Sequence, residues 1–240
     1  MHKRRSEKEK PVDSKIITAS YEILNACMEE VKVSIIKVSK ILNLTYINFY
    51  KEKHKELKNL RKETKELFKE IKEIRNNIPQ TLRKFEDKDL VIGHHYVQIV
   101  TYMKEMSNSL MHIVQPAFDH LDNNHSFEKE KMYKLKEYNE QLSLLFKDAV
   151  DLLTSRDFSK MNELVLQRNE LVKLTNEILL NQVKTLKKIQ KGAKLSATYI
   201  EMLSETKNLI LNLVQLVKAN AKLTSSLLTD EELLLEEVMD

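Results

Sequence analysis

Two stretches of the chain, 100 residues apart, carry matching rows of polar side chains at helical spacing. The first stripe consists of Thr101, Glu105, Asn108, His112, Gln115 and Asp119, and the second of Glu201, Glu205, Asn208, Asn212 and Gln215. Steps of three and four residues place such side chains on one face of an α-helix. No stripe residue is Lys or Arg, although 32% of the chain is charged. Carboxylates, amides and an imidazole so arranged can contact a metal ion, a phosphate or a protein partner. A polar face directed at water is the simpler alternative.

The stripes offer few ligands for a metal ion. Glu105 with Asn108, and Glu205 with Asn208, supply one carboxylate and one amide in each copy. Hard and borderline cations prefer several oxygen ligands, usually more than one of them charged. The sequence therefore predicts no resident cofactor, and at most a weakly bound divalent or ferric ion.

A second candidate metal cluster consists of His120, Asp122 and His125, which offer nitrogen and oxygen ligands within two helical turns. Histidine is the commonest transition-metal ligand. However, these residues straddle an expected helix end, and no cysteine accompanies them. A hydrogen-bonding network that caps the helix, or a docking surface, is the other interpretation of this cluster.

No arrangement typical of an enzyme is present. With only two glycines the chain cannot readily build a glycine-rich phosphate loop. The single cysteine, Cys27, has no histidine near it in sequence, as a nucleophile would require. The motif closest to a di-iron site is Asp122-x-x-His125, which occurs once and at a helix end. We therefore expect a protein without catalytic activity.

The composition predicts an all-α protein. Two glycines and three prolines in 240 residues leave little material for the turns of a β or α/β fold. The net charge is +4, and the bases of residues 51–75 alternate with glutamates, so we expect no nucleic-acid binding. The single cysteine excludes an internal disulfide and fits a reducing compartment. No run reaches the roughly 20 apolar residues of a membrane span, so we expect the chain itself to be soluble.

Apolar periodicity and breaker residues divide the chain into elements. We predict helices over residues 13–44, 46–77, 90–121, 127–153, 159–190 and 193–223. Asn43 and Thr45 mark an expected reversal, Pro79 ends the second helix, and Pro116 kinks the third or marks its last turns. Short connections imply antiparallel neighbours. The predicted fold is two pseudo-symmetric antiparallel three-helix bundles, each with a stripe on its third helix.

The predicted organisation has four parts. Residues 1–12 form a basic arm, residues 13–122 and 123–223 form the two bundles, and residues 224–240 form an acidic, frayed or partner-seeking tail. The packing faces of the third and sixth helices repeat at the same offset as the stripes. Their members are Ile92, Tyr96, Ile99, Met103, Met106, Leu110, Ile113 and Ala117 in the first copy, and Gly192, Ser196, Tyr199, Leu203, Thr206, Ile210, Leu213 and Val217 in the second.

The segment from Gly93 to His125 resembles a known family. With the two-bundle plan, its His94-His95-Tyr96-Val97-Gln98, Lys104-Glu105-Met106-Ser107-Asn108-Ser109-Leu110 and Asp119-His120-Leu121-Asp122-Asn123-Asn124-His125 are similar to the PhoU-like cytoplasmic domain of bacterial sodium/phosphate cotransporters. The resemblance covers about Lys15 to Leu223. The family's acidic E/D-x-x-x-D motif is incomplete here, because Ser109 follows Glu105 and Leu209 follows Glu205 at the fourth position.

The resemblance implies a regulatory role in sodium-dependent phosphate uptake, at the cytoplasmic face of the inner membrane. It implies as partners the membrane domain of a phosphate transporter, on the same chain or in trans, and a phosphate-sensing signalling protein. The basic arm would then lie just after the last membrane span. Two alternatives remain, a free-standing PhoU-type adaptor for a phosphate ABC transporter and sensor kinase, and a passive helical scaffold. The sequence also leaves a homodimer open.

Overall fold

The computed structural model describes residues 14–85, 90–122, 129–186 and 193–239, and these residues form helices and short turns without any strand. The helices are α1 (Ser14–Tyr50), α2 (His54–Asn76), α3 (Ile78–Leu82), α4 (Leu90–Asp122), α5 (Lys129–Ser155), α6 (Met161–Leu186) and α7 (Ala193–Met239). The predicted all-α class is confirmed. Within the described ranges, no helix combines the length and apolar character needed to cross a membrane.

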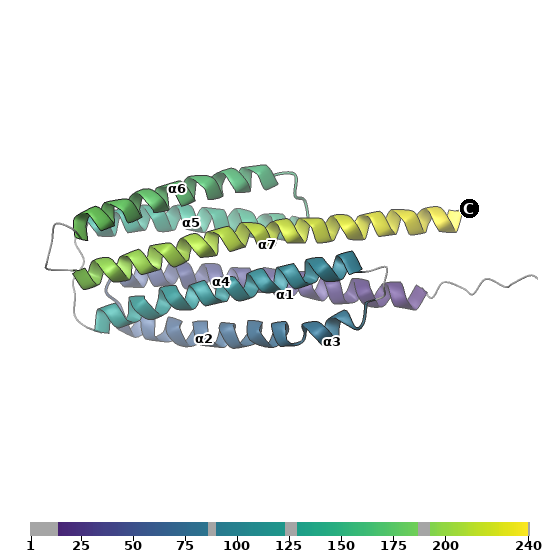
Figure 1. Ribbon diagram of the computed structural model, residues 1–240, viewed down its shortest axis with the longest axis horizontal. Coiled ribbons are helices and arrows are strands. Elements are labelled where there is room, and N and C mark those ends of the chain that lie inside the picture. Colours follow the sequence, from purple (N-terminus) through teal and green to yellow (C-terminus); the bar gives the residue numbers. More distant parts are fainter. Residues whose placement is uncertain (1–13, 86–89, 123–128, 187–192, 240) are drawn as a thin grey trace, which may run out of the picture.

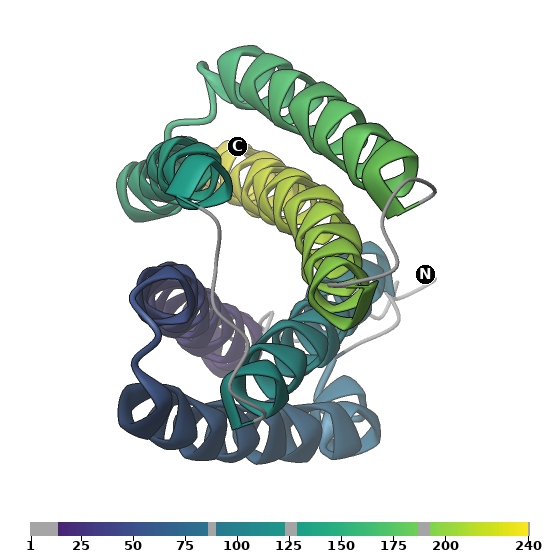
Figure 2. The ribbon, with the colours of Figure 1, turned by 90° about the vertical axis from the view of Figure 1, so that its left-hand side faces the viewer.

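The long helices lie side by side along one axis (Figure 1). Helices α1, α2 and α4 contact one another, and so do α5, α6 and α7. The two groups meet through α4 against α7, the most extensive helix pair of the molecule, and through α1 against α5. Figure 2 shows α2 and α6 on opposite outer sides, with α1, α4, α5 and α7 between them. Each half therefore supplies three long helices in mutual contact; their pseudo-symmetric equivalence stays a prediction.

The predicted packing faces form the core. All eight members on α4 are buried, and so are the members from Tyr199 to Val217 on α7. Gly192, which was assigned to this face, and the side chain of Ser196 lie outside the described part of the structure. Heptad-like apolar spacing buries each helix against two or more neighbours. The polar stripes consequently lie on the remaining face of the same two helices.

The reversal expected at Asn43 and Thr45 is wrong, because α1 continues to Tyr50. The hydroxyl of Thr45 donates to the carbonyl of Ile41 within the helix, at 2.7 Å, so it does not compete with the helical backbone. Tyr46 and Phe49 are fully buried one turn later. Their burial favours continuing the helix, and the turn falls at Glu52, whose φ is 53°.

The end of α7 also differs from the prediction. The sequence predicts a helix ending near residue 223 and a frayed tail over 224–240, whereas α7 continues to Met239 and extends past its neighbours (Figure 1). Residues 224–239 contain no Gly or Pro, and Leu and Glu are the commonest residues there. Both have high helix propensity, which is sufficient reason for the helix to propagate from its packed part.

Pro79 and Pro116 lie as predicted, at a helix boundary and in the last turns of α4. Helix α2 ends at Asn76, and Pro79 occupies the first turn of α3, where a missing amide donor costs nothing. Helix α4 runs through Pro116 to Asp122. In the turn between α5 and α6, Asp157 Oδ1 accepts a hydrogen bond from the Ser159 amide at 2.9 Å.

Buried hydroxyl groups link the helices through the core. Tyr46 on α1 and Thr206 on α7 share a hydrogen bond of 2.7 Å, and Tyr138 on α5 shares one of the same length with Thr175 on α6. The rings of Tyr46 and Tyr138 meet edge to face at 6.0 Å. Burial raises the pKa of both phenols well above the usual range, so both remain neutral donors.

Candidate functional site

The two polar stripes meet in one groove between α4 and α7. Its volume is about 570 Å³. Its lining residues are Glu105, Asn108, Ser109 and His112 from α4, and Glu205, Asn208, Leu211 and Asn212 from α7. Six of the eight belong to the predicted stripes. The tight apolar packing of α4 on α7 sets the spacing of the walls, because the stripes flank the buried faces of the same helices.

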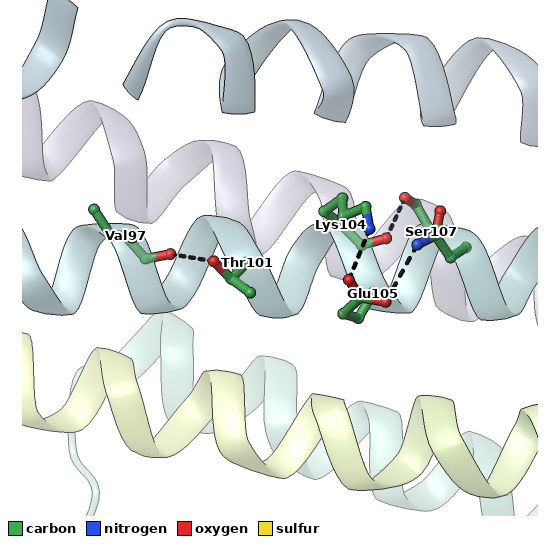
Figure 3. Close-up of polar contacts among 6 residues, drawn as sticks. Val97, Thr101, Lys104, Glu105 and Ser107 are labelled. Carbon is green, nitrogen blue, oxygen red and sulfur yellow. Dashed lines mark hydrogen bonds and ion pairs between the residues drawn. The ribbon is translucent and has the colours of Figure 1, made fainter. Parts of the chain in front are cut away.

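The ends of the stripes lie outside the groove. Thr101 is exposed, and its hydroxyl donates to the Val97 carbonyl at 2.8 Å (Figure 3). Gln115 donates to both carboxylate oxygens of Asp119, at 2.8 and 2.9 Å. Glu201 and Gln215 are exposed on α7. The structure therefore brings together only the central part of each stripe.

On the α4 wall, the negative charge of Glu105 is balanced by Lys104 on the same helix. Lys104 Nζ lies 2.8 Å from Glu105 Oε1, and Asn108 Nδ2 donates to Glu105 Oε2 at 3.2 Å. Figure 3 shows Lys104 and Glu105 side by side on the helix. The hydrogen bond from Lys104, with a smaller contribution from Asn108, holds the pKa of Glu105 below its usual range. Glu105 is thus an ionised carboxylate whose two oxygens already have partners.

The α7 wall lacks this neutralisation. Position 204 is a serine, where the matching position on α4 is Lys104. Among the described residues Glu205 forms no ion pair, and its contact with Asn208 Nδ2 is long, at 3.5 Å. Asn212 Nδ2 donates to the Asn208 carbonyl at 3.0 Å. One wall of the groove therefore presents a carboxylate without an internal cation.

Two lining residues are missing from the predicted stripes. Ser109 is only 5% exposed and lines the groove, and within the described part of the chain its hydroxyl has no hydrogen-bond partner. Leu211 adds the apolar part of the opposite wall. Ser109 is four residues after Glu105, so helical spacing alone places it beside that carboxylate. The spacing of Glu105 and Ser109 is the signal in the sequence that identifies it.

The arrangement offers little to a metal ion. Within the described ranges, no group of three His, Cys, Asp or Glu side chains is placed to hold one. Glu105 and Glu205 supply one carboxylate to each wall, and Glu105 is already bound by Lys104. The weak metal site predicted at Glu105, Asn108, Glu205 and Asn208 stays a prediction, with one carboxylate on each wall of the groove.

The second candidate metal cluster is only partly described. His120 is 1% exposed, and its ring packs edge-on against Phe49 at 5.7 Å between centroids. This is a core position, away from the groove. The Asp122 side chain and His125 lie outside the described residues, so the cluster stays a prediction.

Comparison with known protein families finds no matching family model, and comparison with curated proteins finds no match. The interpretation of the groove depends on its own residues and on their placement.

Proposed function

We propose that this chain is a non-catalytic, PhoU-like regulatory domain that modulates sodium-dependent phosphate uptake at the inner face of the membrane. The observation that carries the proposal is the groove in which the centres of the two repeated stripes face each other. A stripe serving only as a solvated face has no reason to recur at the same offset and to line a shared groove. In this proposal the partner is the membrane domain of a phosphate transporter, on the same chain or in trans.

The position of the groove supports a conformational mechanism. The groove lies on the α4–α7 pair, which forms the main contact between the two halves of the chain. An occupant that touches both walls binds one spacing of these helices better than another. Differential affinity of this kind is what shifts a conformational equilibrium. The two halves then report occupancy to the transporter as a change in their relative position.

The chemistry of the groove favours binding over catalysis. Ser109 and His112 both line it, yet within the described residues they share no hydrogen bond. A nucleophile and its base need such a contact, or one close to it. The amides that dominate the lining are recognition groups without acid–base activity near neutral pH.

Blocking the groove tests the proposal. Asn108→Lys and Asn208→Lys place long side chains into it, and Gln215→Lys adds the same charge on α7 outside the lining. In cells that carry each variant in place of the natural gene, we expect altered uptake of radiolabelled phosphate for the two groove variants only. Circular dichroism should show the same helix content for all three. Unchanged uptake in folded groove variants would support the passive scaffold instead.

A further inference from the structure

We infer that the groove between α4 and α7 binds an arginine side chain of a partner protein, with Glu205 as its principal counter-charge. This inference rests on the proposed function only in treating the groove as a partner-binding surface. It adds the chemical class of the group that enters.

The first step is the charge of the groove. No Lys or Arg lines it, while one carboxylate lies on each wall. Lys104 neutralises Glu105 at 2.8 Å, and Ser204 leaves the matching carboxylate, Glu205, without a cation among the described residues. One negative charge therefore remains for a ligand to balance.

The second step is the supply of hydrogen-bond acceptors. The side-chain amide nitrogens of Asn108, Asn208 and Asn212 each donate one of their two N–H groups within the chain, at 3.2, 3.5 and 3.0 Å. Within the described residues their Oδ1 atoms accept no hydrogen bond. These amide oxygens are therefore available as acceptors. The groove presents amide oxygens on both walls, and on α7 it also presents a carboxylate without an ion pair among the described residues.

The third step is the hydroxyl of Ser109. Ser109 is only 5% exposed and lines the groove, and its hydroxyl makes no hydrogen bond within the described part of the chain. Its oxygen is not one of the fully buried polar atoms that lack a partner, so it opens onto the groove. A hydroxyl both donates and accepts, so it can accept a hydrogen bond from a donor on the occupant.

These features select among ligands. Phosphate carries negative charge, which the carboxylate of Glu205 disfavours because no cation balances it among the described residues. A divalent cation prefers several charged oxygen ligands, and among the described residues Glu205 is the one lining carboxylate without a cation. A guanidinium has five donors in a planar fork and spans acceptors on two sides, whereas an ammonium acts as a point charge. Leu211 adds an apolar surface for the methylene stem.

The probe is the peptide acetyl-Ala-Arg-Ala-amide, added to nitrogen-labelled full-length protein. The side-chain amide signals of Asn108, Asn208 and Asn212 in NMR spectra report on the groove. We expect these signals to shift with the arginine peptide, less with its lysine analogue, and not with the neutral citrulline analogue. Equal shifts with citrulline would overturn the inference, and so would equal shifts with magnesium chloride, manganese chloride or inorganic phosphate alone.

A matched exchange of two residues provides the sharpest test. Ser204→Lys gives α7 the internal cation that α4 has, and we expect it to weaken peptide binding roughly fivefold, at the upper end for an exposed ion pair. Lys104→Ser removes that cation from α4 and should strengthen binding by a similar factor. Glu201→Gln, outside the lining, is the control and should leave affinity unchanged. Equal affinities for the two exchange variants would refute the inference.

Separate control experiments distinguish a folding defect from a binding defect, and this inference from the proposed function. If Ser204→Lys lowers the helical circular-dichroism signal, Glu205→Gln replaces it, with the same expected loss of binding. Arginine-selective binding without any uptake phenotype in the groove variants would retain this inference and remove the proposed function. An uptake phenotype without arginine-selective binding would retain the proposed function and refute this inference.

Discussion

The phenol of Tyr46 and the hydroxyl of Thr206 lie 2.7 Å apart in the core, although 160 positions of the chain separate them. Both side chains are fully buried. Thr206 directly follows Glu205, so this hydrogen bond ties α1 to the part of α7 that forms one wall of the groove. The wall is therefore held by the core as well as by its contact with α4.

Removing either partner of this pair should have unequal effects. In Tyr46→Phe, Thr206 keeps its second bond, to the Met202 carbonyl at 2.8 Å, so we expect a loss of about 1 kcal/mol. In Thr206→Val the phenol remains buried without its partner, and we expect a loss of roughly 2 kcal/mol. Urea unfolding followed by circular dichroism measures both. The explanation fails if Thr206→Val is the milder change.

The ion pair on the α4 wall should be visible in the titration of Glu105. Because Lys104 holds the pKa of Glu105 below its usual range, the carboxylate should protonate at a lower pH than an ordinary glutamate. The stabilisation from this pair is present above the unfolded-state pKa of about 4.3 and is lost as pH falls through the folded value.

Carbon-detected NMR of the Glu105 carboxyl across this range provides the measurement. In Lys104→Met the midpoint should move up toward the ordinary value. A midpoint that is the same in both proteins would show that Lys104 does not set it. Since Glu105 is partly exposed, the effect on total stability should be small.

Cys27 should be inert in the folded protein. It is 4% exposed, and burial, with a smaller contribution from the Glu30 charge, raises its pKa to about 12. The thiolate is the reactive species, so near pH 8 iodoacetamide should modify Cys27 only through opening of the fold. Ionisation favours the unfolded chain, so the stability linked to this thiol is lost as pH rises from about 8.5 toward the folded value.

Mass spectrometry of timed samples follows the modification. Protein in urea is the control, where labelling should be rapid. Labelling of native protein at the rate seen in urea would contradict the buried placement of Cys27.

Gly93→Ala should stabilise the protein slightly. An added Cβ would approach a Leu82 methyl group at 3.1 Å, which is tight but involves the end of a flexible, partly buried side chain. The gain in helix propensity from Gly to Ala is about 1 kcal/mol, and we expect about half of it to remain after Leu82 shifts. Thermal unfolding compares the variant with the parent, and a lower midpoint would mean that α3 cannot yield.

The sequence predicts the helices well because their apolar positions repeat at a spacing that only a helix can bury. The turn at Asn43 and Thr45 was mispredicted because both residues favour turns locally, whereas the burial of Tyr46 and Phe49 is a tertiary effect. The stripes could be found from spacing alone. That they face each other depends on the register of α4 against α7, which no local pattern contains.

The role of Ser109 illustrates the same limit. Its position four residues after Glu105 is evident in the sequence, but its burial and its place in the groove follow from the packing of a helix 100 residues away. Glu105 has an ion-pair partner and Glu205 has none among the described residues, because Lys104 precedes the first and Ser204 the second. This difference matters only because both carboxylates line the same groove, which the sequence does not reveal.

Because α7 is long, a small change in its tilt at the groove moves its far end by a larger distance. From Asn208 to Met239 the helix spans about 47 Å, at about 1.5 Å per residue. A tilt of about 5° at the groove would therefore carry its tip through about 4 Å, if the rod moves as a rigid lever. Spin-label distances between that tip and α1, with and without an occupant, would register this amplification.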